Sequence, residues 1–147
     1  MYDDPIATAL TMLDAEAPKK NVTQQHEPVD QHHRSYVVPT FEGRRQIVHA
    51  SSVADSLFGQ RLELFSVAVR EIPRDAGLFI ALLVAARDFR RARLCVMDAD
   101  NPALSVVATF LPDDINESAG PRLLSALREV AAIADSLENQ IVGVDIE

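Results

Sequence analysis

Apolar residues recur at helical spacing in three stretches of the chain, near residues 5–15, 78–89 and 123–141. The first follows Asp4 and Pro5, which suit the N-cap and the first helical position. The second is apolar around most of its circumference, which predicts a helix buried on more than one side. The third carries a straight apolar stripe, because spacings of four and three residues alternate along it. The stripe consists of Leu123, Leu127, Val130, Ala134, Leu137 and Ile141.

The stretches between these helices are rich in β-branched and aromatic residues and predict short strands. Pro39 favours an edge position for the first strand, because proline donates no hydrogen bond to a neighbouring strand. The polar loop 98–103 joins the last two strands and fits a hairpin better than a crossover. The predicted strands are Tyr36–Phe41, Gln46–Ala50, Arg61–Arg70, Arg93–Met97 and Leu104–Leu111.

This order of elements, α-βββ-α-ββ-α, predicts an α+β fold with helices packed on an antiparallel sheet of about five strands. The chain divides into an N-terminal helix at 1–15, a polar linker at 16–34 and an α+β domain at 35–147. We interpret 16–34 as a linker because it contains two prolines and few branched aliphatic residues. The stripe of the last helix fits either core or a dimer seam, and core is favoured because one face of the sheet must be covered.

Length and composition indicate one globular domain. The chain has 147 residues, of which 48% are hydrophobic and 24% are charged, as is usual for globular proteins. It has no run of about 18 consecutive apolar residues, which a membrane-spanning helix requires, and its first residues are acidic, unlike a secretory signal. We therefore expect a cytoplasmic protein without a membrane partner. The single cysteine, Cys95, excludes an internal disulfide and a cysteine-based zinc site.

The net charge of −8 is distributed unevenly along the chain. Residues 1–34 sum to −3, residues 35–97 to +3 and residues 98–147 to −8. A negatively charged protein repels phosphate backbones, so we expect no nucleic-acid partner. The basic middle part can complement the acidic last part within a dimer or meet an acidic partner, and the sequence does not choose between these alternatives.

Residues that could carry chemistry are scattered. A metal or catalytic site would draw on the histidines, most of which fall in the polar segment without rigid support. Cys95 lies within a predicted strand with no histidine close in sequence, which is typical of a structural thiol. The five glycines form no phosphate-binding loop. We therefore predict no catalytic residue, no metal site and no cofactor. The histidines are His26, His32, His33 and His49.

One dense basic run lies at the end of the second predicted helix. It consists of Arg87, Arg90, Arg91 and Arg93. Cations at a helix C-terminus interact favourably with the helix dipole, which explains the run without a partner. The alternative is a binding patch for an acidic segment, which requires the four side chains to point the same way.

Several stretches between residues 46 and 141 share one pattern of apolar and turn residues with a known family. The first is the strand that ends in VAVREIP at 67–73, and the next is the helix Leu78–Phe89. The others are the hairpin of RLCVM at 93–97 with VVATFLP at 106–112, and the closing helix from LLSAL at 123–127 through ADSL at 134–137. In these stretches the chain resembles the YbjN family of the type III secretion chaperone-like (CesT/Tir chaperone) superfamily, in particular its short single-domain actinobacterial members. The resemblance spans about two thirds of the chain.

The resemblance implies an antiparallel sheet flanked by helices, frequent dimerisation and no catalytic residues. It also implies binding of extended client segments, or a regulatory role. An exposed sheet edge offers unpaired backbone groups to such a segment. We therefore predict a non-enzymatic peptide- or protein-binding module, a chaperone or regulatory adaptor that forms a homodimer; the alternative is a small-molecule sensor with a helix-sheet cleft. The predicted partner-binding residues are Tyr36, Val38 and Phe41 on the candidate edge, with Arg87, Arg90, Arg91 and Arg93.

Overall fold

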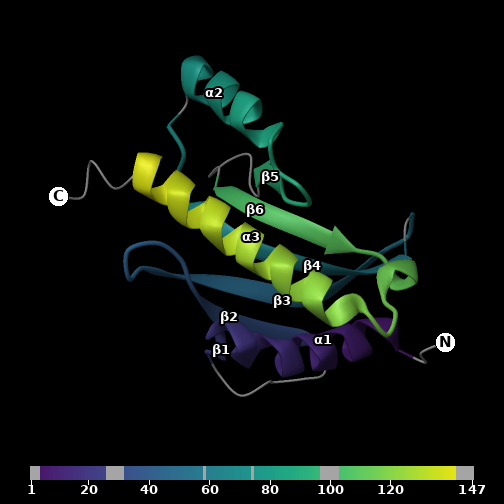
Figure 1. Cartoon of the computed structure of the whole chain (residues 1–147). Coiled ribbons are helices and arrows are strands. Elements are labelled where there is room, and N and C mark those ends of the chain that lie inside the picture. The colour runs from purple at the N-terminus through teal and green to yellow at the C-terminus, as the bar shows by residue number, and fades with distance from the viewer. Residues whose placement is uncertain (1–3, 26–31, 58, 74, 97–102, 142–147) are drawn as a thin grey trace.

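The computed structural model describes residues 4–25, 32–57, 59–73, 75–96 and 103–141 (Figure 1). The elements within these ranges are, in chain order, α1 (Pro5–Glu16), the 3-10 helix η1 (Ala17–Lys20), β1 (Thr23–Gln24), β2 (His33–Pro39), β3 (Arg45–Asp55), β4 (Gly59–Val69), α2 (Ala76–Ala86), β5 (Arg93–Val96), β6 (Leu104–Phe110), the 3-10 helix η2 (Pro112–Asp114) and α3 (Ala119–Ile141). Asp4 caps α1 as predicted, because its carboxylate accepts a hydrogen bond from the Ala7 amide at 3.1 Å.

The strands form one sheet in the order β1-β2-β3-β4-β6-β5, and all neighbours are antiparallel. The predicted α+β class is therefore confirmed, with six described strands instead of about five. β1 was missed because two residues are too few to show an alternating pattern. The antiparallel pairing of β5 with β6 confirms the predicted hairpin, although most of its loop lies outside the described residues.

The segment predicted as a linker, residues 16–34, contains regular structure. It includes η1, β1 and the start of β2. Ala17 and Val22 are buried, because these small side chains join the hydrophobic core. The linker prediction is therefore wrong for these residues, and residues 26–31 lie outside the described part of the chain.

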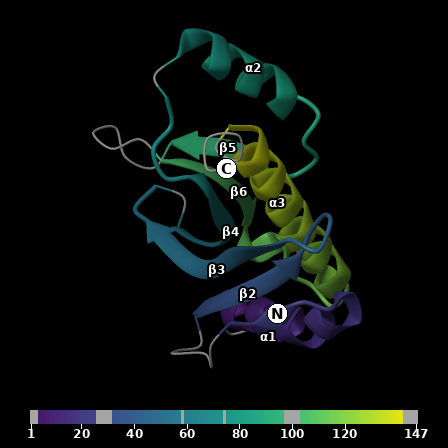
Figure 2. The same cartoon turned by 90° about the vertical axis from the view of Figure 1, so that its left-hand side faces the viewer.

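α1 and α3 together cover one face of the sheet (Figure 2). Alternate residues of each strand point toward this helical layer, as the two-residue period of a strand requires. Tyr36, Val48 and Leu64 are examples, and all three are fully buried. The stripe of α3 from Leu123 to Leu137 is buried against the same face. This confirms the interpretation of the stripe as intramolecular core.

Polar contacts also attach the helices to the sheet. The Asp14 carboxylate of α1 accepts hydrogen bonds from the Tyr36 hydroxyl at 2.6 Å and from Arg34 Nε at 3.1 Å. Burial, followed by this hydrogen bond, raises the pKa of Tyr36. In the turn before β3, Arg44 Nη2 donates to Asp135 of α3 at 2.9 Å, and Asp135 is only 5% exposed. The hydrogen bond to Asp135 raises the pKa of Arg44.

α2 stands away from the layer formed by α1 and α3 (Figures 1 and 2). Leu82 is the buried residue of this helix, although all eleven of its residues are apolar. The prediction that this helix is buried on more than one side is therefore wrong. Apolar side chains point in every direction around α2, but the fold supplies cover on one side only. Among the described residues, no helix combines the length and the apolar character needed to cross a membrane.

Candidate protein-binding surface

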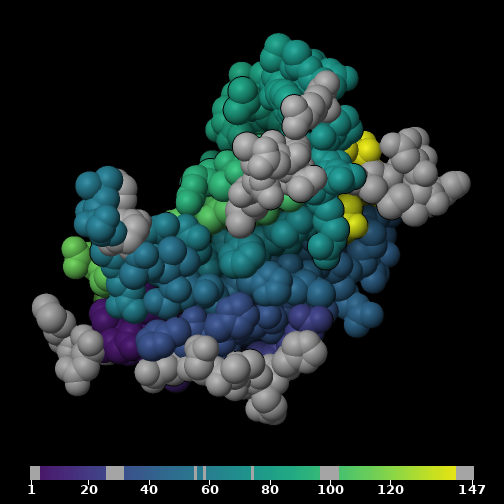
Figure 3. All heavy atoms as spheres, turned by 180° about the vertical axis from the view of Figure 1, so that it is seen from behind, coloured from purple at the N-terminus to yellow at the C-terminus, as the bar shows by residue number. Residues whose placement is uncertain are grey.

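The candidate site is an exposed apolar region formed by α2 and the end of β5. Ile80 and Leu83 on α2 are 62% and 71% exposed, and Val96 on β5 is 53% exposed. Figure 3 shows α2 projecting from the rest of the molecule. Large exposed apolar patches are typical of protein contacts, because soluble monomers rarely leave them in water. We call Phe79, Ile80, Leu83, Val84 and Val96 the apolar surface.

Contacts at its two ends hold α2 in place. Asp75 caps the N-terminus, where its carboxylate accepts hydrogen bonds from the amides of Gly77 at 2.8 Å and Leu78 at 3.2 Å. After the C-terminus, the Glu129 carboxylate of α3 accepts hydrogen bonds at 2.8–3.0 Å from the three backbone amides of residues 90–92. Most of the helix between these anchors is exposed, so polar contacts at its ends position it more than packing does.

A small cavity separates α2 from β5 and β6. Its volume is about 210 Å³. The lining is apolar except for one thiol, and it consists of Ile72, Phe79, Leu82, Leu83, Leu94, Cys95, Val96 and Leu104. Pockets for drug-sized ligands usually measure about 300–1,000 Å³, so this cavity is smaller than a typical small-molecule site. It shows that α2 is only loosely packed on the sheet.

β5 is an edge of the sheet beside the apolar surface. It pairs with β6 and with no other described strand. Cys95 lies in this strand opposite Ser105, and its side chain is partly exposed. An edge strand offers unpaired backbone donors and acceptors to a second strand. The apolar surface therefore adjoins a backbone that can extend the sheet.

Two of the three residues predicted to lie on an exposed sheet edge are buried instead. Tyr36 and Val38 point toward the helices and are buried, whereas Phe41 lies beyond β2 and is exposed. β1 pairs with β2 at Tyr36 and Val37. The prediction of an edge is wrong where β1 covers β2, and the outermost described strands are β1 and β5.

The four predicted arginines do not form one patch. The Arg91 guanidinium lies 4.3 Å from the centre of the Phe110 ring, whereas Arg93 donates a hydrogen bond to the Thr109 hydroxyl at 2.7 Å. Thr109 and Phe110 are consecutive in β6, so they face opposite sides of the sheet. The four side chains therefore do not point the same way. The remaining members of the run, both exposed, are Arg87 and Arg90.

The histidines among the described residues do not gather into one site. His32 Nε2 is 2.7 Å from a carboxylate oxygen of Asp4. His33 and His49 stack with their ring centroids 5.9 Å apart. Burial, followed by the charge of His33, lowers the pKa of His49. Within the described ranges, no group of three or more His, Cys, Asp or Glu side chains could hold a metal ion, and the candidate His26 lies outside these ranges.

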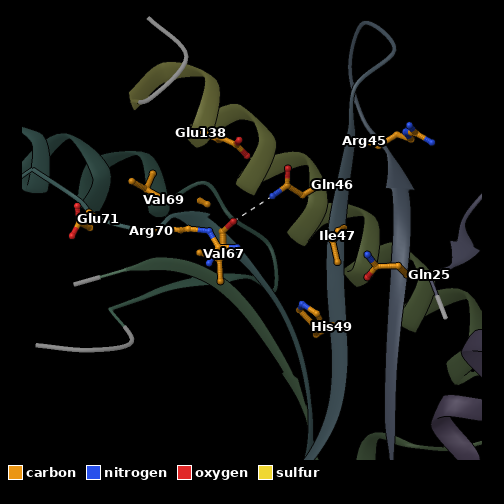
Figure 4. Close-up of a pocket in the computed structure, with 11 residues that line it drawn as sticks. Gln25, Arg45, Gln46, Ile47, His49, Val67, Val69, Arg70, Glu71 and Glu138 are labelled. Atoms are coloured by element: carbon orange, nitrogen blue, oxygen red, sulfur yellow. Dashed lines mark hydrogen bonds between the residues drawn. The ribbon is translucent and has the colours of Figure 1, made fainter. Parts of the chain in front are cut away.

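A second concave region lies where β3 and β4 separate, and we call it the fork groove (Figure 4). The groove is open and measures about 700 Å³. Ile47 of β3 and Val67 of β4 form its apolar part. Arg45, Arg70 and Glu138 are among its charged residues, and Glu138 is contributed by α3. Because strand backbone, apolar side chains and charges all meet here, the groove has the chemistry needed to hold a peptide.

Ile80, Leu83 and Glu129 are site residues that the sequence patterns did not single out. A signal for the first two was present, because a helix that is apolar on every face needs a second apolar environment, inside or outside the fold. Nothing in the sequence connected Glu129 with backbone amides about forty residues earlier, since that contact depends on tertiary structure.

Comparison with protein-family models and with curated proteins matched this chain to none of them. The resemblance to the YbjN family therefore stays a prediction based on the stretches quoted above.

Proposed function

We propose that this chain is a non-enzymatic protein-binding module that forms a homodimer through the apolar surface. The observation that carries the proposal is the exposure of Ile80 and Leu83 on a helix that the fold itself anchors. Complete burial of a large apolar side chain is worth roughly 1.5–3 kcal/mol. Burial of this surface by a partner would therefore stabilise the complex relative to the single chain.

A second copy is the occupant that the geometry favours. In a two-fold contact each copy presents the same patch, so an apolar helix meets another apolar helix. The edge strand β5 lies beside the same patch and can pair with its counterpart along a two-fold axis. The apolar side chains and the β5 edge lie in one continuous region. A single interface can therefore bury the side chains and pair the two β5 strands at the same time.

We infer a binding role for the dimer as well, as a chaperone or regulatory adaptor of the cytoplasm that takes extended client segments. The resemblance to the YbjN and secretion-chaperone proteins supports this role. The fork groove supports it too, because it exposes strand backbone next to apolar and charged side chains. A small-molecule sensor has weaker support, since the apolar cavity under α2 holds only about 210 Å³.

Sedimentation velocity tests the dimer over protein concentrations of about 1–100 µM, where mass action reveals weak association. The native chain is expected to sediment as a dimer. The double substitution Ile80→Asp/Leu83→Asp is expected to give a monomer with unchanged circular dichroism, because both side chains are exposed in the single chain. Leu111→Asp serves as the matched control, since Leu111 is also an exposed apolar residue but lies beyond β6.

The proposal fails if the native chain is monomeric throughout this range. It also fails if the α2 variant and the Leu111 control dimerise equally well. In either case the apolar surface is not the interface of a homodimer.

A further inference from the structure

The cavity under α2 has a buried floor and an exposed rim. Ile72, Leu82 and Leu104 form the floor, and each is at most 7% exposed. Leu83 of α2 and Val96 of β5 form part of the rim, and both are exposed. A small molecule can therefore enter from solvent and reach side chains that belong to the hydrophobic core.

The lining offers almost no hydrogen bonds. Among the described residues that line the cavity, Cys95 alone has a polar group in its side chain, and its sulfur lies 3.8 Å from the carbonyl oxygen of Val96. A thiol is a weak donor and a weak acceptor. A ligand hydroxyl or carboxylate would therefore lose its hydration without a comparable partner. The chemistry of the lining selects an apolar ligand.

The size and two of the lining side chains favour a single aromatic ring. An apolar cavity of about 150 Å³ accepts benzene, so the 210 Å³ under α2 can hold one ring with a small substituent. The ring of Phe79 and the sulfur of Cys95 lie in the lining, and both form favourable contacts with aromatic groups. An aliphatic molecule of equal volume would lack these contacts.

A ligand in this position would contact α2 and the sheet together. Phe79, Leu82 and Leu83 line the cavity from α2, whereas Leu94 and Val96 line it from β5, which lies beside the helix (Figures 1 and 2). Polar contacts hold α2 at its two ends, and the cavity lies between those ends, where packing is incomplete. Occupancy therefore adds packing where the helix has least.

We propose that the cavity under α2 is a binding site for a small apolar aromatic molecule, and that the bound molecule fixes α2 on the sheet. The site lies within one chain, so this inference does not depend on the proposed homodimer. It gives the chain a means by which a ligand controls how firmly the apolar surface is presented.

Nuclear magnetic resonance titration of the full-length chain tests the site, with toluene and phenol as probes of similar volume. Toluene is expected to shift the methyl signals of Leu82, Leu94 and Leu104 and to bind with a dissociation constant below about 1 mM. Phenol is expected to bind several-fold more weakly, because a thiol is the only partner that the described lining offers to its hydroxyl. Equal binding of the two probes would contradict an apolar site.

Two variants at one position provide a matched pair. Cys95→Phe places a ring in the cavity and is expected to abolish toluene binding, whereas Cys95→Ala leaves the space open and is expected to keep the affinity within about threefold. Cys95 is partly exposed, so both variants are expected to retain the native circular dichroism. Toluene binding that survives in Cys95→Phe would overturn the assignment of the site.

Two measurements on the native chain need no variant. Cys95 is the single cysteine, so alkylation by iodoacetamide reports on this cavity alone, and saturating toluene is expected to slow it several-fold. Toluene is also expected to slow hydrogen exchange in α2 several-fold. Unchanged methyl signals and an unchanged alkylation rate up to the solubility of toluene would overturn the site. Unchanged exchange in α2 with toluene bound would overturn the effect on the helix.

The variant Ile80→Asp/Val84→Asp separates this site from the proposed dimer. Both residues belong to the apolar surface, and neither lines the cavity. The variant is expected to bind toluene as the native chain does, whatever its oligomeric state. Loss of binding would show that a second copy completes the site and would overturn the assignment to one chain.

Discussion

α2 and α3 show how differently one chain can use two apolar helices. All eleven residues of α2 are apolar, yet only Leu82 is buried. α3 alternates apolar and polar residues over 23 positions, and eleven of them are buried. The helix with the higher apolar content is thus the less covered one. Burial follows from what lies opposite a side chain, so a narrow stripe that faces a sheet contributes more to stability than apolar residues that face water.

The two helices also differ in what holds them. α3 lies along the sheet and packs against α1, β3, β4 and β6. α2 depends on Asp75 at one end and on Glu129 after the other. We conclude that α3 belongs to the folding core, whereas α2 is a presented element whose position is fixed by hydrogen bonds. Variants of each helix can test this division.

The largest difference is expected from equal truncations in the two helices. Leu127→Ala in α3 should lower the free energy of unfolding by about 2–5 kcal/mol, because this side chain is fully buried. Leu83→Ala in α2 should change it by less than about 0.5 kcal/mol in the monomer, because Leu83 is exposed. Urea denaturation at low protein concentration measures both. Equal losses would show that α2 is part of the core.

Removal of the Glu129 carboxylate should have the next largest effect. Glu129→Ala leaves three backbone amides without their charged acceptor, and each hydrogen bond to a charged group contributes about 1.5–3 kcal/mol when buried and less when exposed. We expect faster hydrogen exchange in α2 and residues 90–92, with the sheet unaffected. Glu138→Ala, a nearby exposed carboxylate of α3 without such contacts, is the control. Loss of protection throughout the sheet would contradict the assignment of Glu129 to α2.

Loss of a helix cap should distinguish the anchored helix from a packed one. Asp75→Ala removes the N-cap of α2 and should lower local helix stability by about 1 kcal/mol, which is visible as faster exchange in α2 alone. Asp4→Ala removes the equivalent cap of α1, where packing of Ile6, Leu10 and Leu13 should keep the helix protected. If hydrogen exchange in α1 speeds up as much after Asp4→Ala as exchange in α2 does after Asp75→Ala, packing does not protect α1 more than α2.

The smallest effect on stability is expected from His49, which lies on the face of the sheet that α1 and α3 leave uncovered. His49 has a lowered pKa in the folded protein, so the unfolded chain binds its proton first as the pH falls. Stability from this group is complete above its ordinary pKa of 6.5 and decreases as the pH falls below it. Thermal denaturation between pH 8 and 5 should show a slope that His49→Gln reduces. An unchanged slope in His49→Gln would contradict the prediction.

Several elements could be predicted from local sequence because local chemistry decides them. The Asp4 cap and Pro5 mark the start of α1, and the stripe of α3 is buried as its spacing indicates. The β5–β6 hairpin follows from a short polar loop between two β-rich runs. β1 could not be predicted in this way, because a two-residue strand exists only where β2 lies beside it.

The candidate site was predicted less well. Phe41 is exposed as an edge residue should be, but Tyr36 and Val38 face the core, because alternation along β2 sends successive side chains to opposite faces. The arginine run has a helix end beside it, as the dipole interpretation requires, yet Arg91 and Arg93 diverge because the chain enters a strand at that point. The face of the sheet to which a side chain points depends on the pairing register of its strand, and the spacing of residues in the sequence does not reveal that register.

The amino-acid sequence by itself determined that this chain forms helices and antiparallel strands, and which face of α3 is apolar. Periodicity and capping are local properties, so they can be recognised in the residues alone. Only the tertiary structure decided that α2 has an uncovered face and that β3 and β4 separate after the His49–Phe65 pair. Both depend on how much sheet lies opposite each element, and that is a consequence of packing between residues far apart in the chain.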